Sequence, residues 1–296
     1  MHFDSAHCTL CPRECGADRT KGQGFCGGGD TVRAARAALH LWEEPPISGT
    51  NGSGTVFFSG CALHCRFCQN ASISQVPFGK DITPDRLCEI FFRLEAQGAH
   101  NINLVTAGHF LPYLLPALRS AKPQLSIPIV WNSGGYEKPE ALRLLDGLVD
   151  IWLPDFKFFF PETARDYANA PDYPAVADAA LSEMLRQVGT PVMQSGLMQR
   201  GVILRHLVLP GHRHESVALL RHLAEAYGTS AFLLSLMSQY TPMHEDADFP
   251  ELNRRITKME YLSVVKEAEV LGFGGFTQDK TSAERAYTPD FSLQGL

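Results

Sequence analysis

The feature that most constrains this chain is a group of three cysteines, Cys61, Cys65 and Cys68, on one short stretch. The group follows the apolar run Thr55–Ser59, which predicts a buried strand that Gly60 turns into a loop. Three thiolates on one loop suit an iron–sulfur cluster, whereas a closed cluster of the [4Fe–4S] type takes four. Three cysteines would therefore leave one iron open to a small ligand that offers an amine and a carboxylate.

A second group of cysteines lies near the N-terminus and comprises Cys8, Cys11, Cys15 and Cys26. Pro12 and the neighbouring glycines would bend these four thiolates into a closed site with no open position for catalysis. Zinc and a closed iron–sulfur cluster both suit such a site, and a disulfide-linked or reduced loop is the alternative. Because the segment has few apolar residues, a bound metal would also help it to fold. The remaining cysteine, Cys88, falls in a helical pattern and is expected to be a core side chain.

Composition restricts the class of protein. The chain has 296 residues and a formal net charge of −6, which argues against a broad nucleic-acid-binding surface. Its first residues have neither the basic nor the apolar region of a signal peptide, and no stretch is apolar enough to span a bilayer. In a cytoplasmic protein, cysteines that lie in groups along the sequence favour metal binding over disulfide bonds. We therefore expect a cytoplasmic protein with no membrane partner and no nucleic-acid partner.

Strand-like and helix-like segments alternate from Thr55 onward. Apolar, β-rich runs predict strands at 55–59, 102–106, 127–132, 151–158, 202–209 and 232–238. Helical patterns follow them at 84–97, 111–121, 139–145, 175–188, 216–227 and 257–271. Six β-then-α units predict an α/β fold with a parallel sheet, an incomplete (β/α)6 TIM-like barrel. We divide the chain into a small Cys-rich metal-binding segment with a connector, 1–50, and a partial barrel, 51–296.

Polar residues recur where the predicted strands end. In parallel α/β folds the chemistry lies at the carboxyl ends of the strands, which all meet at one face. Each of the six units supplies polar residues there: the cysteine loop, Thr106, Asn132, Asp155 with Lys157, Arg205, and Gln239. Six units that each contribute to one rim predict a single site at that face.

The order of these motifs resembles the radical SAM superfamily, which uses S-adenosylmethionine (SAM), and within it enzymes related to pyruvate formate-lyase activating enzyme. The phrases that carry the resemblance are 57–61, 68–70, 153–157 and 205–211, and it covers about residues 51 to 280. It looks closest to a branch with an additional N-terminal four-cysteine segment. The resemblance implies that Cys61, Cys65 and Cys68 ligate three irons of a [4Fe–4S] cluster and that SAM binds the fourth iron.

The same resemblance implies that seven further residues contact SAM, namely Phe67, Thr106, Asn132, Asp155, Lys157, Arg205 and Gln239. Phe67 would lie beside the adenine. Asp155 and Lys157 would flank the methionyl amine and carboxylate, and their charges suit those groups. The family commonly has a Gly-Gly-Glu stretch after its second strand, whereas this chain has Thr106-Ala107-Gly108. Here backbone carbonyls would have to receive the amine.

The resemblance also implies a reaction. A reduced cluster would cleave SAM to methionine and a 5′-deoxyadenosyl radical, which abstracts hydrogen from a substrate. Flavodoxin or ferredoxin would supply the electron. The substrate could be a glycyl radical enzyme, for which this oxidoreductase would be the activase, or another protein, a peptide or a small molecule. An electron-transfer protein without SAM chemistry is a further alternative, but such a carrier needs no charged pair like Asp155 and Lys157 beside its cluster.

Overall fold

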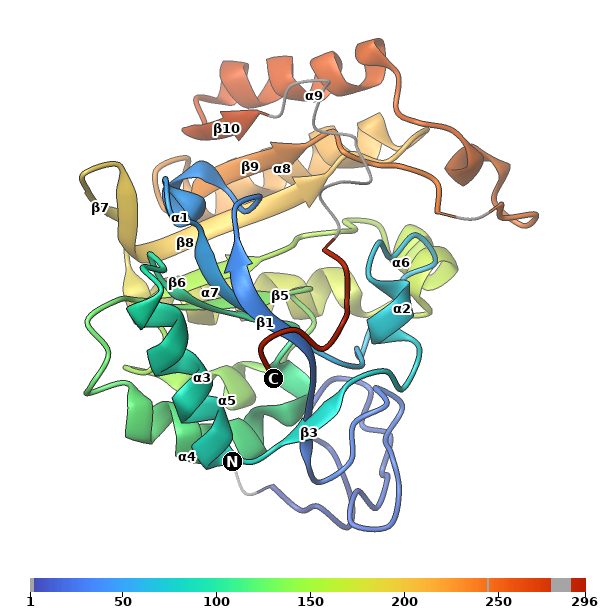
Figure 1. The fold of residues 1–296 in the computed structure, drawn as a ribbon. Helices are drawn as coiled ribbons and strands as arrows, with labels where there is room; N and C mark the ends of the chain where they lie inside the picture. Colours follow the sequence, from blue (N-terminus) through green and yellow to red (C-terminus); the bar gives the residue numbers. More distant parts are fainter. Residues whose placement is uncertain (1–2, 244, 278–288) are drawn as a thin grey trace.

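A single sheet with the strand order β10-β9-β8-β6-β5-β4-β2-β1-β3 organises the molecule (Figure 1). The computed structural model describes residues 3–243, 245–277 and 289–296. Six neighbouring strands run parallel, and they are β2 (Ser53–Phe58), β4 (Ile102–Val105), β5 (Ile129–Ser133), β6 (Ile151–Pro154), β8 (Leu197–Leu207) and β9 (Leu233–Met237). These correspond to the six strands predicted from the sequence and stand in chain order, so the predicted α/β fold is confirmed.

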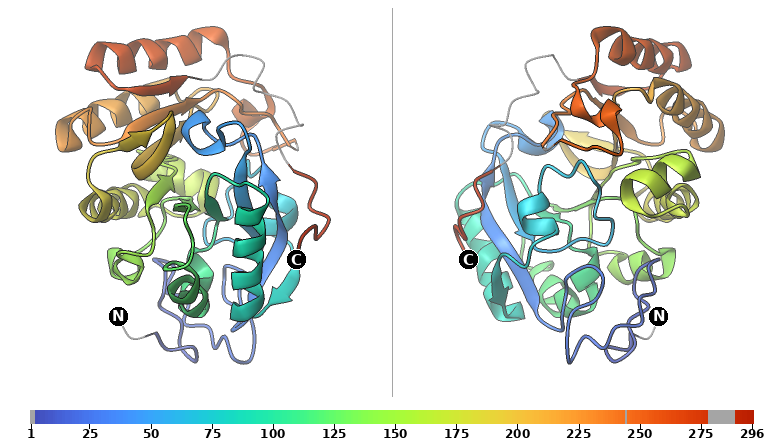
Figure 2. Two further views of the ribbon diagram at one scale, coloured as in Figure 1. Left: turned by 60° about the vertical axis from the view of Figure 1, so that its left-hand side comes forward. Right: turned by 90° about the vertical axis from the view of Figure 1, so that its right-hand side faces the viewer.

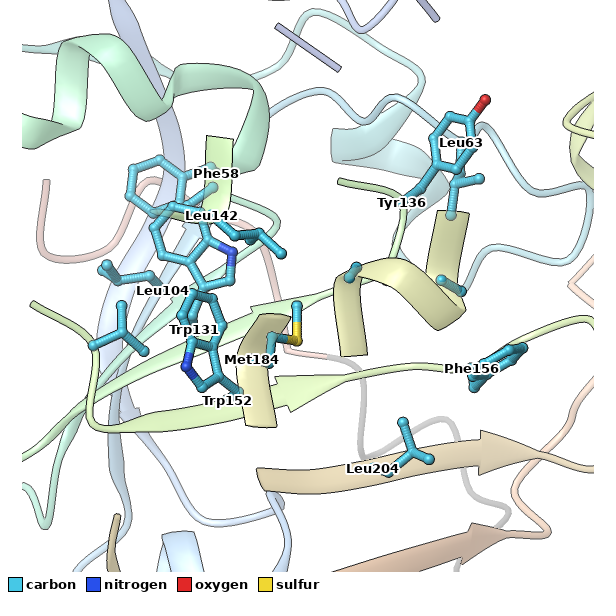
Figure 3. Close-up of a cluster of buried hydrophobic side chains, with 14 of the residues drawn as sticks. Phe58, Leu63, Leu104, Trp131, Tyr136, Leu142, Trp152, Phe156, Met184 and Leu204 are labelled. Atoms are coloured by element: carbon cyan, nitrogen blue, oxygen red, sulfur yellow. The ribbon is translucent and has the colours of Figure 1, made fainter. Parts of the chain in front are cut away.

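Helices follow the parallel strands and cover the outer face of the sheet. The predicted ones form α3 (Pro84–Ala96), α4 (Leu111–Ala121), α5 (Pro139–Leu142) with the 3-10 turn η2 (Arg143–Leu145), α7 (Tyr173–Val188), α8 (Arg213–Tyr227) and α9 (Lys258–Leu271). Shorter elements without a predicted counterpart are α2 (Ala71–Ser74), η1 (Gly108–Phe110), α6 (Pro161–Ala168) and η3 (Pro250–Asn253). Trp131 and Trp152 lie next to each other under these helices, near Leu104 and Leu142 (Figure 3).

Four further strands extend the sheet beyond the prediction. They are β1 (Val32–His40), β3 (Lys80–Ile82), β7 (Val192–Gln194) and β10 (Gly275–Thr277). β1 runs antiparallel to β2 and to β3, whereas β10 runs parallel to β9. Within the described part of the chain, β3 and β10 end the sheet without pairing to each other, so the barrel is partial.

β1 returns the chain to the amino ends of the parallel strands. There α1 (Pro45–Ser48) places Ile47 inside the barrel, against Val130, Ile151 and Ile203. The region 42–54, whose prolines and glycines indicate an extended connector, is therefore also part of the barrel. It includes a short helix at the amino ends of the parallel strands, and β2 separates this helix from the three cysteines at the opposite end.

The last described residues lie along β1. The Leu293 amide donates to the Ala35 carbonyl at 3.1 Å, and the Ala37 amide donates to the Gln294 carbonyl at 2.8 Å. The Phe291 ring meets the Phe57 ring edge-on, with centroids 5.3 Å apart. In Figure 1 this dark red segment runs beside the blue β1 strand. The C-terminal residues thus cover the side of the barrel on which the sheet is open.

Helix α9 begins with a capping box. The Thr257 hydroxyl accepts a hydrogen bond from the Glu260 amide, and the Glu260 carboxylate accepts one from the Thr257 amide. We predict that Thr257→Ala lowers the free energy of unfolding by about 1 kcal/mol, the usual effect of losing an N-cap. Denaturant unfolding measures this value. The exposed Thr190→Ala should change it by no more than about 0.5 kcal/mol, and equal losses in both variants would contradict the assignment.

Candidate functional site

The three-cysteine loop leaves β2 at Gly60, whose φ is +88°. A side chain cannot be placed there, because a Cβ on Gly60 would lie 2.3 Å from the Cys26 carbonyl oxygen. Cys65 is buried, while Cys61 and Cys68 are partly buried, and all three are free thiols. Burial raises the pKa of Cys61 and of Cys65, although the charge of Lys157 opposes the shift for both. As thiolates these side chains would need a positive partner, which a bound metal provides.

All ten residues that were predicted to form the site in the barrel line one cavity. It has a volume of about 1260 Å³ including its open mouth, and its lining includes Cys61, Cys65, Phe67, Cys68, Thr106, Asn132, Asp155, Lys157, Arg205 and Gln239. They come from the loop after β2 and from the carboxyl ends of β4, β5, β6, β8 and β9. The predicted convergence of six units on one rim is therefore present in the structure.

A buried network of charges forms one wall of this cavity. Arg205 Nε donates to Asp155 Oδ1 at 2.8 Å, and Arg205 Nη2 donates to Asn132 Oδ1 at 2.6 Å. Lys157 Nζ donates to the other oxygen of Asp155 at 2.5 Å. The side chains of Asp155, Arg205 and Lys157 are 12%, 15% and 21% exposed. Burial alone would raise the pKa of Asp155, but Arg205 and Lys157 lower it, so the carboxylate is held ionised between two cations.

Two glutamates from the segment after β1 join this network and were not predicted. Glu43 lies 3.6 Å from Arg205 Nη1 and accepts a hydrogen bond from Asn132 Nδ2 at 3.4 Å. Glu44 lies 4.0 Å from Arg205 Nη1 and accepts from Ser235 Oγ at 3.2 Å. Both carboxylates enter the barrel from its amino end, where α1 closes it. Glu43 also lines the cavity, so a ligand in the cavity can meet a carboxylate from that side.

The pH dependence of the free energy of unfolding should show that the Glu43 carboxyl is buried. Burial, aided by the Glu44 and Asp155 carboxylates and opposed by Arg205, raises the pKa of Glu43 to about 7. The folded protein therefore holds this proton more tightly than the unfolded chain does. The resulting stabilisation is complete below the ordinary pKa of 4.5 and is lost as the pH rises through about 7. Glu43→Gln cannot ionise, so we predict that its free energy of unfolding relative to wild type rises between about pH 5 and 8.

Denaturant unfolding at several pH values measures this difference. The control is Glu225→Gln, which changes an exposed glutamate on α8. Its stability relative to wild type should show no such rise over the same range. Parallel pH profiles for wild type and Glu43→Gln would contradict the buried position of this carboxyl.

Thr106 has an unusual backbone at the end of β4. Its φ is +59°, a conformation that is rare for a β-branched residue and marks strain. Its amide donates to the Asn132 carbonyl at 2.8 Å, which ties it to the next strand. Two residues on, a Cβ at Gly108 would lie 2.8 Å from the buried Glu137 carboxylate, which accepts hydrogen bonds from Trp131 and Ser133. Contacts with Asn132 and Glu137 thus hold the stretch Thr106-Ala107-Gly108, which departs from the family pattern, in place.

Phe67 and Gln239 also line the cavity and carry no charge. Phe67 is buried and meets the rings of Phe158, Tyr167 and Tyr240 edge-on, at centroid distances of 5.9, 6.3 and 6.1 Å. The Gln239 backbone carbonyl accepts from Gln69 Nε2 at 3.4 Å, so the end of β9 is joined to the cysteine loop. The cavity lining therefore includes aromatic and amide groups as well as the charged ones.

The four N-terminal cysteines gather beside the three-cysteine loop. Burial raises the pKa of Cys11 to about 11, and the nearby thiols of Cys26, Cys8 and Cys15 add to the shift. The sulfurs of Cys15 and Cys26 lie 3.4 and 3.6 Å from the position that a Cβ on Gly24 would take. In both views of Figure 2 this dark blue segment lies against the lower end of the barrel. The structure therefore brings together the four residues that were predicted as a second metal site.

The thiols of each group are neighbours, but they do not converge on a single ion. Among the described residues, no three His, Cys, Asp or Glu side chains converge closely enough to hold one metal ion. Across the same residues, no helix is both long enough and apolar enough to cross a membrane.

Comparison with known proteins places the barrel in a large family. Residues 55–224 match the sequence family described as the radical SAM superfamily. The chain is also 30% identical over 271 residues to the uncharacterized protein MJ0674 of Methanocaldococcus jannaschii, and the match covers 89% of this chain and 74% of that protein.

Solved structures with a similar fold include two enzymes of distant sequence. A radical SAM methyltransferase from Sphaerobacter thermophilus superposes with a TM-score of 0.50 at 14% identity, over 76% of this chain and 66% of the methyltransferase. HydG, a maturase of the [FeFe]-hydrogenase, superposes with a TM-score of 0.51 at 16% identity, over 85% of this chain and 54% of HydG. Both likenesses concern the fold alone.

Proposed function

This chain belongs to the radical SAM superfamily, and we propose that it binds a [4Fe–4S] cluster and SAM in the barrel cavity and cleaves SAM reductively. The observation that carries the proposal is that three free thiols and the charged groups of Asp155, Lys157 and Arg205 line the same cavity at the carboxyl ends of the strands. The donor set fits the group: three soft sulfur ligands for iron, with a cation beside them. When bound, the cluster and SAM supply a 5′-deoxyadenosyl radical for hydrogen abstraction.

The protein's own residues would hold and orient the nucleoside. Cys61, Cys65 and Cys68 hold the cluster. Asp155 presents a carboxylate to the methionyl ammonium, and Lys157 presents an ammonium to the methionyl carboxylate.

Further contacts extend along the cavity. Arg205 donates to Asp155 and fixes its orientation, Asn132 in turn accepts from Arg205, and both line the wall beside Asp155. Phe67 packs beside the adenine and Gln239 reaches the ribose, while Thr106 contributes backbone groups. The buried cavity walls keep water from the reacting centre.

A direct assay tests this proposal. The chain is reconstituted with iron and sulfide without oxygen, reduced with dithionite and mixed with SAM. We expect 5′-deoxyadenosine and methionine to form in equal amounts, as chromatography and mass spectrometry can measure. A reduced, cluster-loaded chain that leaves SAM intact would overturn the proposal.

Within this class we propose that the chain is a cytoplasmic oxidoreductase that activates a glycyl radical enzyme with electrons from flavodoxin or ferredoxin. The proposal rests on the resemblance of the phrases 153–157 and 205–211 to pyruvate formate-lyase activating enzyme. Electron paramagnetic resonance (EPR) should show a glycyl radical on a glycyl radical enzyme encoded beside this gene after incubation with the chain, SAM and reductant. Absence of that signal, with SAM cleavage intact, would favour a peptide or small-molecule substrate.

We further propose that Cys8, Cys11, Cys15 and Cys26 hold a second metal centre, either zinc or iron–sulfur. Their mutual proximity supports this assignment. The radical SAM match begins at Thr55 and does not include these cysteines. Metal analysis of a chain that lacks the three barrel cysteines identifies the metal, and a metal-free segment would contradict the assignment.

A further inference from the structure

The N-terminal segment carries a buried charge with no ionic partner among the described residues. Arg19 is 1% exposed, and its Nη1 donates to the His109 carbonyl at 2.6 Å. Its Nε and Nη2 atoms are buried without a hydrogen-bond partner. The rings of Phe3, Phe110 and Tyr113 lie 5.2 to 6.0 Å from the guanidinium. A buried cation is costly unless an anion offsets it, and aromatic faces compensate only part of that cost.

The N-terminal cysteines, like the Tyr113 phenol, are groups near this guanidinium that can become anionic. A Cβ on Gly28 would lie 2.7 Å from Arg19 Nη2, a Cβ on Gly24 would lie 3.4 Å from the Cys15 sulfur, and the Gly24 amide donates to the Gly28 carbonyl at 3.0 Å. Four thiolates around a metal centre carry a net negative charge, which would offset the charge of Arg19. The unpaired guanidinium thus indicates that an anionic centre belongs beside it.

The same segment is attached to the barrel at the cysteine loop. The Cys61 amide donates to the Cys26 carbonyl at 3.0 Å, so one cysteine of each group is joined by a single hydrogen bond. Only a residue without a side chain at Gly60 permits this contact. Cys11 and Cys61 also line one cavity of about 550 Å³. The two groups of cysteines are therefore neighbours.

Additional contacts fix the two loops against each other. Arg13 Nε donates to the Ala62 carbonyl at 2.9 Å, and Arg13 Nη2 donates to the Leu63 carbonyl at 3.3 Å. The Phe25 ring stacks on the His64 ring with centroids 4.7 Å apart. Exposure also differs within the N-terminal group: Cys15 is exposed, whereas Cys26, which meets the barrel loop, is buried. One cysteine of the group, Cys15, therefore faces solvent, and another, Cys26, lies beside Cys61.

We propose that Cys8, Cys11, Cys15 and Cys26 hold a redox-active iron–sulfur cluster, with Arg19 as its buried counter-charge, that delivers electrons to the barrel cluster. One electron passes from a protein reductant to this centre near Cys15, and the same electron leaves near Cys26 for the centre on Cys61. Each transfer oxidises the donor and reduces the acceptor by one electron, and no bond forms or breaks. The delivery rests on the proposed barrel cluster, whereas the N-terminal cluster and its counter-charge rest only on the second metal centre proposed above.

The N-terminal centre can be examined alone in a variant with Cys61→Ala, Cys65→Ala and Cys68→Ala. We expect this chain to retain one cluster's iron and sulfide and to give an EPR signal after reduction with dithionite. Zinc in place of iron, or a metal that cannot be reduced, would overturn the proposal. Neither result depends on whether the intact chain cleaves SAM.

The role of Arg19 is tested by the potential of that centre. In the same background, Arg19→Gln removes the buried charge, so the midpoint potential should become more negative, because an added electron loses a stabilising cation. Arg19→Lys should restore most of the shift, and Arg200→Gln, at an exposed position, should leave the potential unchanged. Equal potentials for wild type and Arg19→Gln would contradict the counter-charge.

Electron delivery is tested with Cys8, Cys11, Cys15 and Cys26 all changed to Ser. Mixing with reduced flavodoxin, followed by rapid freezing and EPR, should show reduction of the barrel cluster at least tenfold more slowly than in wild type. Dithionite, a small reductant, should still reduce that cluster fully, which shows that the barrel remains intact. Equal rates of reduction by flavodoxin in wild type and in the four-serine variant would refute the delivery. The delivery would also be refuted if dithionite no longer reduced the barrel cluster of that variant and Arg19→Gln left the midpoint potential of the N-terminal centre unaltered.

Discussion

Cys65→Ala is expected to abolish the formation of 5′-deoxyadenosine, to the level of a reaction without protein. Cys65 is the buried member of the three-cysteine loop, and a chain with two remaining thiolates cannot hold three irons of a cluster. After anaerobic reconstitution and reduction, chromatography measures the nucleoside while metal analysis measures iron. The variant should keep only the iron that the N-terminal cysteines bind.

Cys88→Ala is the matched control for this experiment. Cys88 is also a free, partly buried thiol, but it lies on α3, where its sulfur contacts the Ala117 carbonyl at 3.5 Å. Its loss should change neither iron content nor 5′-deoxyadenosine. Activity that survives in Cys65→Ala, or disappears in Cys88→Ala, would show that the cluster is not held where we propose.

Asp155→Ala is expected to lower the free energy of unfolding of the metal-free protein by about 3–5 kcal/mol, the usual effect of removing one partner of a buried ion pair. Among the described residues, the change leaves Lys157 without a carboxylate, and Arg205 keeps the Asn132 amide oxygen and the more distant carboxylates of Glu43 at 3.6 Å and Glu44 at 4.0 Å. Denaturant unfolding measures this loss. The reconstituted variant should also bind SAM at least about tenfold more weakly, because a charge-assisted hydrogen bond contributes more than about 1.4 kcal/mol.

Glu89→Ala serves as the control for stability. Glu89 forms an exposed ion pair with Arg86 at 2.7 Å on the surface of α3, and such pairs contribute less than about 1 kcal/mol. Its replacement should therefore have a small effect. If both variants lose equal stability, the charges around Asp155 do not form the buried network described above.

The parallel part of the sheet was predictable because its strands are continuous apolar runs separated by helical periodicity. β1 was not, since Val32–His40 is rich in alanine and carries two arginines, neither of which is typical of a strand. The segment is a strand because it pairs antiparallel with β2, and this pairing is a tertiary contact that the local sequence does not specify. The short strands β3 and β10 also depend on pairing with a neighbouring strand. They were not predicted because three residues give too short a pattern to recognise.

The candidate site was predictable where local motifs supply it, as in the cysteine loop and the Asp155–Lys157 pair. Glu43, Glu44 and Arg19 escaped prediction for a physical reason. The glutamates lie in a stretch with prolines and glycines that resembles a connector, and only the return of β1 brings them into the barrel. Arg19 resembles a surface residue in a polar segment, and its burial depends on packing against Phe110 and Tyr113.

The central claim is that three thiolates hold a cluster whose open iron binds SAM. The most direct measurement is EPR of the anaerobically reconstituted, dithionite-reduced chain before and after addition of SAM. To isolate the barrel cluster, the four N-terminal cysteines are changed to Ser. We predict a reduced [4Fe–4S] spectrum whose shape and g-values change when SAM is added. A reduced cluster whose spectrum is the same with and without SAM would contradict the account.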